Sequence, residues 1–211
     1  VLMNLADYDE TAPCGELTLA DRWILSRYAQ TVNGVTDNLE RFELGEAARM
    51  LYDFIWGEYC DWYIELAKPR LYSKEGATGR QTAQFVLAYI LERTMRLLHP
   101  FMPFISEEIR SHLPNSAGSI VRSAWPAAEP QRIDEAAEAQ MNAVMDVIKA
   151  VRNMRAEMNV PPGRKGEVII QLANQGLENV LSENLPFIKT MATAEPVTTI
   201  PASAEKPENS V

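Results

Sequence analysis

Helical periodicity, interrupted by short breaks, is the feature of this sequence that most restricts its fold. Apolar residues recur every three to four positions over most of the chain up to residue 158, which is the spacing of one face of an α-helix. Thr18 has the side chain of a helix N-cap, and Asp21 follows in the first turn, where the helix dipole favours a carboxylate. The pattern predicts helices over residues 18–39, 43–67, 78–98, 103–113 and 134–158.

Prolines mark the expected ends of these helices. We expect Pro69 to end the helix over residues 43–67, because proline cannot continue the backbone hydrogen-bond ladder. The helix over residues 78–98 is expected to stop at His99, since the residue before a proline avoids the α region. Pro103 suits the first turn of the next helix.

The sequence changes character after residue 158. A Pro-Pro-Gly break is followed by the run EVIIQL, which predicts a strand over residues 167–172, and by a short helix over residues 176–185. One or two strands are not stable alone, so this part is either packed on the helices or incomplete. We therefore expect three parts, with mainly α structure. They are a helical bundle over residues 1–158, a small α/β appendage over residues 159–200 and a disordered tail over residues 201–211.

Composition excludes several classes of protein. The 46% of hydrophobic and 23% of charged residues are typical of a globular chain and not of a disordered one. The longest stretches without a charged residue have eleven residues, well below the roughly 20 that a membrane-spanning helix needs. The N-terminus has no secretory signal pattern. Two cysteines and two histidines make neither a disulfide framework nor a zinc pattern, so we expect no metal, no membrane and a reduced, cytoplasmic setting.

The charge of the chain argues against a broadly basic nucleic-acid binder, because its formal net charge is −9. A local exception runs from residue 149 to residue 165, where five basic residues face one acid. A Gly-rich phosphate loop, a Cys-x-x-Cys pair and a nucleophile elbow are all missing from the sequence. These patterns favour a helical bundle without a catalytic centre of its own.

Aromatic residues concentrate in the predicted helix over residues 43–67. One stripe at helical spacing is expected to form the core of a bundle, and stacking of its rings on nucleobases is the alternative. The stripe consists of Tyr52, Trp56, Tyr59, Tyr63 and Leu66. The opposite face of the helix carries two hydrogen-bond acceptors, a cation and apolar residues. It consists of Gly57, Asp61, Ile64, Glu65 and Lys68, and Phe54 is also expected to point outward. This face is either solvated, with Glu65 in a local ion pair, or a surface for base edges and a phosphate.

The predicted helix over residues 134–158 carries two arginines near its end. Arg155 falls within the apolar stripe of this helix and Arg152 lies at its edge. A cation in such a position either extends its charged group past the helix end or meets a partner, and a phosphate backbone is one such partner. Both interpretations remain open on the sequence alone.

Four strings of the sequence together resemble the anticodon-binding region of the valyl-tRNA synthetases. The resemblance covers nearly all of residues 1–170, and the second and third strings are shared in looser form with the isoleucyl and leucyl families. The combination of CDWYIE with RAEMNVPP is typical of the valyl family. The strings are LADRWILSR (19–27), LYDFIWGEYCDWYIELAKPRLY (51–72), RLLHPFMPFISEEI (96–109) and VRNMRAEMNVPP (151–162).

The resemblance implies the anticodon-binding helical bundle of a class I synthetase. The catalytic domain of such an enzyme has a Rossmann-type fold, and its signature motifs do not occur here. The chain would therefore be a C-terminal piece without catalytic residues or cofactors, and ATP with Mg²⁺ would bind the catalytic domain. The implied partners are valine tRNA and the catalytic domain of the same protein. The alternatives are the equivalent domain of an isoleucyl-type enzyme and a non-catalytic interaction module.

The resemblance also implies a tRNA-binding site. In the family, the end of the CDWYIE helix lies close to the anticodon loop. That places Asp61, Trp62, Ile64 and Glu65 near the loop, with Lys68 one turn later. The other implied residues are Arg152 and Arg155, as contacts to the RNA backbone or as links between domains.

Overall fold

The computed structural model describes residues 1–12, 14–73, 77–114, 116, 118–161, 163–172 and 176–201. The chain forms two compact units, Val1–Glu138 and Ala139–Val211. Helix α6 (Glu135–Glu157) begins at the end of the first unit and continues in the second. No helix within the described ranges combines the length and the apolar composition that crossing a membrane requires.

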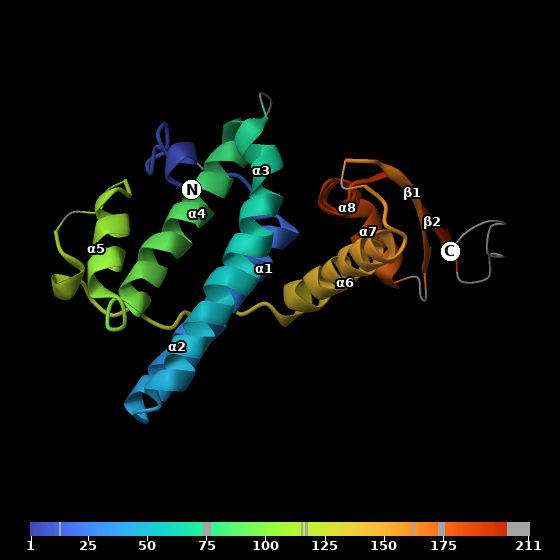
Figure 1. Ribbon diagram of the computed structural model, residues 1–211. Coiled ribbons are helices and arrows are strands. Elements are labelled where there is room, and N and C mark those ends of the chain that lie inside the picture. Colours follow the sequence, from blue (N-terminus) through green and yellow to red (C-terminus); the bar gives the residue numbers. More distant parts are fainter. Residues whose placement is uncertain are drawn as a thin grey trace. The chain divides into compact units, whose positions relative to one another are not determined.

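Long helices form the first unit (Figure 1). They are α1 (Leu19–Glu40), the uninterrupted run of α2 (Leu44–Tyr52), η2 (Asp53–Tyr63) and α3 (Ile64–Tyr72), and then α4 (Ala77–Leu98) and α5 (Pro103–Ser111). The connections contain three short 3₁₀ helices, η1 (Leu2–Asn4), η3 (Ile120–Arg122) and η4 (Pro130–Arg132). Helices α1, α3 and α5 each pack against α4, which makes α4 central to this unit.

The start of α1 confirms the predicted cap. The backbone N–H of Thr18 donates to Asp21 Oδ2 at 2.9 Å, and the backbone N–H of Asp21 donates to Thr18 Oγ1 at 3.4 Å. This reciprocal pair is a capping box, which satisfies two backbone donors at the helix end. The predicted apolar rhythm of the helix is also found in the core, where Trp23, Val32 and Val35 are buried.

The helix through Pro69 corrects a prediction. Proline was expected to end this helix before residue 69, but α3 continues to Tyr72 with Pro69 inside it. Two tertiary contacts outweigh the lost backbone hydrogen bond. Leu71 is fully buried, and the guanidinium of Arg70 donates to both carboxylate oxygens of Asp21 at 2.6 and 2.7 Å.

The second unit contains the predicted α/β appendage. Strand β1 (Gly166–Leu172) matches the predicted strand, and α7 (Gly176–Glu183) matches most of the predicted short helix. Helix α8 (Leu185–Ala192) and strand β2 (Ala194–Pro201) were not predicted. The two strands pair in parallel, with Val168 opposite Val197 and Ile170 opposite Thr199. A parallel pair needs a crossover connection, which α7 and α8 supply.

The fold class is therefore confirmed as mainly α with a small α/β part. The most compact division of the chain falls within α6, after Glu138, and α6 itself ends at Glu157. The boundary between domains at residues 158 and 159 stays a prediction. Of the tail expected over residues 201–211, Pro201 ends β2 and residues 202–211 lie outside the described residues.

Candidate nucleic-acid interface

A π-helix carries most of the aromatic segment. Over Asp53–Tyr63 the backbone has π geometry, and at its end the N–H of Ile64 donates to the carbonyl of Tyr59, five residues back. Such helices are rare, usually span a single turn, and occur frequently at functional sites. Since each turn holds more residues than in an α-helix, the faces of this segment differ from those that an α-helical wheel predicts.

Three aromatic positions correct the α-helical interpretation. Tyr52 and Trp56 were expected in the core, but their side chains are exposed and their ring centroids lie 6.4 Å apart. Phe54 was expected to point outward, but it is buried, with its ring centroid 5.8 Å from that of Tyr28. The extra residues per turn of the π-helix account for both differences. The alternative of base stacking thus remains open for Tyr52 and Trp56.

The rest of the aromatic stripe lies in the core as predicted. Tyr59, Tyr63 and Leu66 are buried, and the two tyrosine rings stack with centroids 6.2 Å apart. The Tyr59 hydroxyl donates to the carbonyl of Leu87 at 2.9 Å, which ties the π-helix to α4. Burial raises the pKa of the Tyr59 and Tyr63 hydroxyls well above the ordinary value of a tyrosine, so both side chains are neutral hydrogen-bond donors.

A buried ion pair fixes the next part of this helix. The hydroxyl of Tyr63 donates to Asp21 Oδ1 at 2.7 Å, and Arg70 forms its two hydrogen bonds to the same carboxylate. Burial alone would raise the pKa of Asp21, but the hydrogen bonds and charge of Arg70 outweigh it, and that pKa lies below its ordinary value. The residues between Tyr63 and Arg70 are therefore held in a set orientation against the N-terminus of α1.

Four of the seven predicted site residues lie within this anchored segment or just before it, and their side chains are at least partly exposed. Asp61 is exposed, and Ile64, Glu65 and Lys68 are partly exposed. Lys68 Nζ lies 2.5 Å from Glu65 Oε1, so the local ion pair expected for Glu65 is present. We call Ile64, Glu65 and Lys68 of α3, together with Asp61 near the end of η2, the α3 face. It offers two carboxylates as acceptors, one ammonium and one apolar side chain.

Trp62 differs from its neighbours in this segment. Its side chain is only 7% exposed, because it lies among the core residues of the first unit. Its ring is therefore not presented to a ligand in this conformation. A role for Trp62 in tRNA binding stays a prediction, and packing beneath the α3 face is the role that its burial favours.

The remaining two predicted residues belong to the second unit. Arg152 Nε donates to the carbonyl of Met191 at 2.8 Å, at the end of α8. The guanidinium of Arg155 donates to the carbonyls of Pro161 and Arg164 at 3.2 and 2.6 Å. Both arginines thus connect α6 to segments that follow it in the chain. The structure groups the first five predicted residues in one unit and these two in the other.

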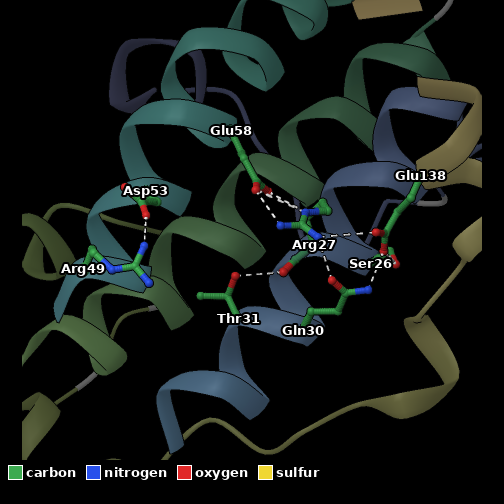
Figure 2. Close-up of polar contacts among 8 residues, drawn as sticks. All are labelled: Ser26, Arg27, Gln30, Thr31, Arg49, Asp53, Glu58 and Glu138. Atoms are coloured by element: carbon green, nitrogen blue, oxygen red, sulfur yellow. Dashed lines mark hydrogen bonds and ion pairs between the residues drawn. The ribbon is translucent and has the colours of Figure 1, made fainter. Parts of the chain in front are cut away.

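A polar cluster around Arg27 was not predicted from the sequence (Figure 2). Arg27 Nη2 and Nε donate to the two carboxylate oxygens of Glu58 at 2.8 and 3.0 Å, and Nη1 lies 3.4 Å from Glu138 Oε2. Gln30 Nε2 donates to Glu138 Oε1 at 2.9 Å, and the Ser26 hydroxyl donates to the same oxygen. Hydrogen bonding to Glu58 raises the pKa of Arg27. Glu58 and Glu138 lie 31 and 111 positions from Arg27 in the sequence, so no helical spacing pattern could have paired them with it.

The Arg27 cluster connects three elements of the first unit. It joins α1, the middle of the π-helix and the start of α6, and the N–H of Asp134 also donates to Ser26 Oγ at 2.8 Å. Two carboxylates surround one guanidinium, so the cluster as a whole is negative. Among the described residues, no group of His, Cys, Asp and Glu side chains has the arrangement of a metal site.

Comparison with known proteins finds relatives that match most of this chain. Residues 21–170 match the family described as the anticodon-binding domain of tRNA ligase. The chain is 48% identical over 200 residues to a valine--tRNA ligase of Carboxydothermus hydrogenoformans, covering 93% of the chain and 22% of that relative. The identity is 42% over 213 residues to a valine--tRNA ligase of Bacillus cereus, covering 100% of the chain and 24% of the relative. The identity is 44% over 190 residues to a valine--tRNA ligase of Bacillus subtilis, covering 89% of the chain and 22% of that relative.

The chain spans less than a quarter of the length of these curated relatives. The resemblance to the valyl-tRNA synthetases that four strings of the sequence indicated is confirmed by these identities. The family match includes the π-helix, the α3 face and the arginines of α6. The chain therefore belongs to the family of anticodon-binding domains of tRNA ligases.

Proposed function

We propose that this chain binds the anticodon loop of valine tRNA and positions that tRNA for a valyl-tRNA synthetase. ATP-dependent attachment of valine would take place on a catalytic domain of the same protein, with Mg²⁺ and ATP bound there, in the cytoplasm. The observation that carries the proposal is the family match over residues 21–170, together with 42–48% identity to valine--tRNA ligases. On this proposal the chain contributes binding and orientation, and no chemical step.

The α3 face supplies the groups that we propose for the anticodon contact. Carboxylates accept hydrogen bonds from base amino groups, so Asp61 and Glu65 suit base edges. Ile64 lies between them in the sequence and offers an apolar side chain against a base. The ammonium of Lys68 suits a phosphate oxygen, and its ion pair with Glu65 leaves the side chain 44% exposed.

We propose Arg152 and Arg155 as contacts to the RNA backbone or as links between domains. Their hydrogen bonds to backbone carbonyls support the second role. A guanidinium has five N–H donors, so one that already donates to a carbonyl can also bind a phosphate oxygen. Phosphate contacts of this kind set the position of an RNA without reading its sequence.

Footprinting of valine tRNA by the chain tests this function. Nucleotides of the anticodon loop should become protected from a backbone-cleaving reagent as the chain is added, while the acceptor end should keep its reactivity. Protection confined to the acceptor end, or no protection at low salt, would contradict the proposal.

A non-catalytic interaction module is the second candidate function. The observation that favours it is the pairing of exposed cations with acids, since Lys68 contacts Glu65 and, further towards the N-terminus of the same helical run, Arg49 contacts both Glu46 and Asp53. Together with a net charge of −9, this pairing predicts weak and strongly salt-dependent RNA binding. A chain that gives no footprint at any salt concentration would favour this candidate.

A further inference from the structure

Two arginines share one carboxylate where η4 meets α4. Glu129, the N-cap of η4, forms ion pairs with Arg132 of the same turn and with Arg93 of α4, whose Nη1 lies 3.6 Å from Glu129 Oε1. The same two guanidiniums lie over the ring of Tyr89, with the Cζ atoms of Arg93 and Arg132 4.3 and 4.8 Å from its centroid. The Tyr89 hydroxyl also donates to Glu129. One carboxylate thus compensates two cations, which leaves an excess of positive charge.

A second carboxylate on α4 is shared in the same way. Glu92 Oε1 lies 2.6 Å from Arg96 Nη2 and 2.8 Å from Arg110 Nε of α5. The side chain of Arg110 is buried and holds α5 on α4, whereas that of Arg96 is partly exposed. We call the four arginines and two glutamates of these ion pairs the arginine cluster. It consists of Arg93, Arg96, Arg110, Arg132, Glu92 and Glu129.

The excess of cations sets the arginine cluster apart from other ion pairs of the first unit. Around Arg27, and again around Arg49, two carboxylates surround one guanidinium. In the arginine cluster each carboxylate is shared by two guanidiniums, so a chain of net charge −9 has a local positive potential there. Guanidiniums that are partly exposed attract anions, and their paired N–H donors fit phosphate oxygens.

The arginine cluster is held in place before any ligand binds. The ring of Tyr89 and the shared carboxylates fix its guanidiniums, so binding an anion would cost little side-chain entropy. Tyr28 lies beside Tyr89, with ring centroids 6.2 Å apart, and its buried hydroxyl has no hydrogen-bond partner among the described residues. Burial raises the pKa of Tyr28, and the nearby charges of Arg93 and Arg96 oppose this rise. A buried hydroxyl of this kind is unfavourable until an oxygen of a water or a ligand satisfies it.

Resting on the function proposed above, we propose that the arginine cluster binds phosphates of the tRNA backbone through Arg93, Arg96 and Arg132. The cluster belongs to the same unit as the α3 face, and the family match over residues 21–170 includes it. These arginines are not among the residues that the sequence indicated for tRNA binding. The contact is to phosphate, so it holds the tRNA in position without reading its bases.

Titration of arginine variants with valine tRNA at several salt concentrations tests this site. Arg93→Gln and Arg132→Gln should each weaken binding about tenfold at low salt and reduce the salt slope by about one, because each removes a phosphate contact. The ratio of affinities for valine tRNA and for the same tRNA with a changed anticodon should stay as in the wild-type chain. Arg49→Gln is the matched control, since Arg49 is exposed and pairs with Glu46 and Asp53, and it should bind tRNA as the wild-type chain does.

Glu129→Gln separates phosphate binding from a purely structural role of the cluster. Glutamine can still accept from the Tyr89 hydroxyl, but the negative charge beside the two arginines is removed. Phosphate binding predicts that this variant binds tRNA about threefold more tightly at low salt, with a steeper salt slope, whereas a structural role predicts no gain. Glu46→Gln is the control for net charge, because it removes an exposed acid that pairs with Arg49, and its affinity should not change.

The outcomes separate this site from the function on which it rests. Urea denaturation of each variant establishes that it is folded under the conditions of the titration. Wild-type affinity and salt slope in both Arg93→Gln and Arg132→Gln would overturn the arginine cluster as a phosphate site. A folded Glu129→Gln variant that binds tRNA no more tightly than the wild-type chain would also overturn it, and if that variant does not fold, the arginine variants decide. Absence of tRNA binding by the wild-type chain would overturn the proposed function itself.

Discussion

At the scale of single residues, the carboxylate of Asp21 is the most consequential group in the first unit. It is fully buried, accepts three side-chain hydrogen bonds from Arg70 and Tyr63, and also closes the cap of α1. Removing one partner of a buried ion pair leaves the other charge uncompensated, which costs about 3 kcal/mol. Asp21 therefore links the helix that begins the bundle to the helix that carries the α3 face.

We predict that Asp21→Asn lowers the free energy of unfolding by about 3 kcal/mol, measured by urea denaturation at neutral pH. The buried guanidinium of Arg70 would lose its counter-ion. The control is Asp37→Asn, an exposed position on the same helix, which should change the free energy of unfolding by less than about 0.5 kcal/mol. Equal effects of the two substitutions would contradict this role for Asp21.

The lowered pKa of Asp21 predicts how the stability of the chain depends on pH. The pKa of Asp21 is lower in the folded chain than in the unfolded chain, so the unfolded chain binds more protons in acid. The stabilisation is thus fully present above the unfolded pKa of about 4 and is lost as the pH falls through the folded pKa. Urea denaturation between neutral and acidic pH should show a shallower decline for Asp21→Asn than for the wild-type chain. Parallel declines would show that Asp21 titrates alike in both states.

At the scale of elements, the π-helix decides which aromatic side chains reach the core. The α-helical wheel was right for Tyr59 and Tyr63, and wrong for Tyr52, Phe54 and Trp56. Hydrophobic spacing alone fits either helix type, because the choice depends on contacts with α1 and α4 that are distant in the sequence. The end of α3 could not be predicted for the same reason, since tertiary contacts of its last turn outweigh Pro69.

This geometry predicts opposite roles for two neighbouring aromatic residues. Phe54→Ala should lower the free energy of unfolding by about 3 kcal/mol, because it leaves a cavity beside Tyr28. Trp56→Ala should cost less than about 1 kcal/mol, because that side chain is 55% exposed. Urea denaturation of both variants provides the measurement. The reverse order would be expected of an ordinary α-helix and would contradict the π-helix.

In the second unit, β1 was predictable and β2 was not. The run EVIIQL has the β-branched composition of a strand, whereas β2 begins and ends near prolines, which are normally read as breaks. Pairing with β1 and packing against α8 stabilise β2, and neither contact is visible in the local sequence. The hydrogen-bond partners of Arg152 and Arg155 could not be predicted either, because their acceptors are backbone carbonyls, which carry no sequence signal.

At the scale of the whole molecule, we expect a few cations to be decisive for the proposed RNA binding, because the chain has a net charge of −9. Substitution of Lys68, Arg152 or Arg155 by Ala should each weaken tRNA binding with little dependence on the tRNA sequence, and each should reduce the salt slope by about one. Arg22→Ala is the control, since this arginine is partly exposed and pairs with Asp134. Titrations at several salt concentrations provide the measurement. Wild-type affinity and salt slope in all three variants would show that the proposed surface is wrong.

The two units also allow a test of whether they hold one tRNA together. Lys68 belongs to the first unit and Arg152 to the second. If both contact the same RNA molecule at separate points, the free-energy losses of the two substitutions should add in the double variant to within about 0.5 kcal/mol. A double variant no weaker than Lys68→Ala alone would indicate that the second unit does not contact the RNA.

A binding titration tests whether the chain reads the anticodon. The chain would be titrated with valine tRNA and with the same tRNA carrying a changed anticodon, at two salt concentrations. We expect weaker binding to the changed tRNA at both salt concentrations, because base contacts depend on sequence whereas phosphate contacts do not. Equal affinity for the two tRNAs, or no binding to either at low salt, would contradict it.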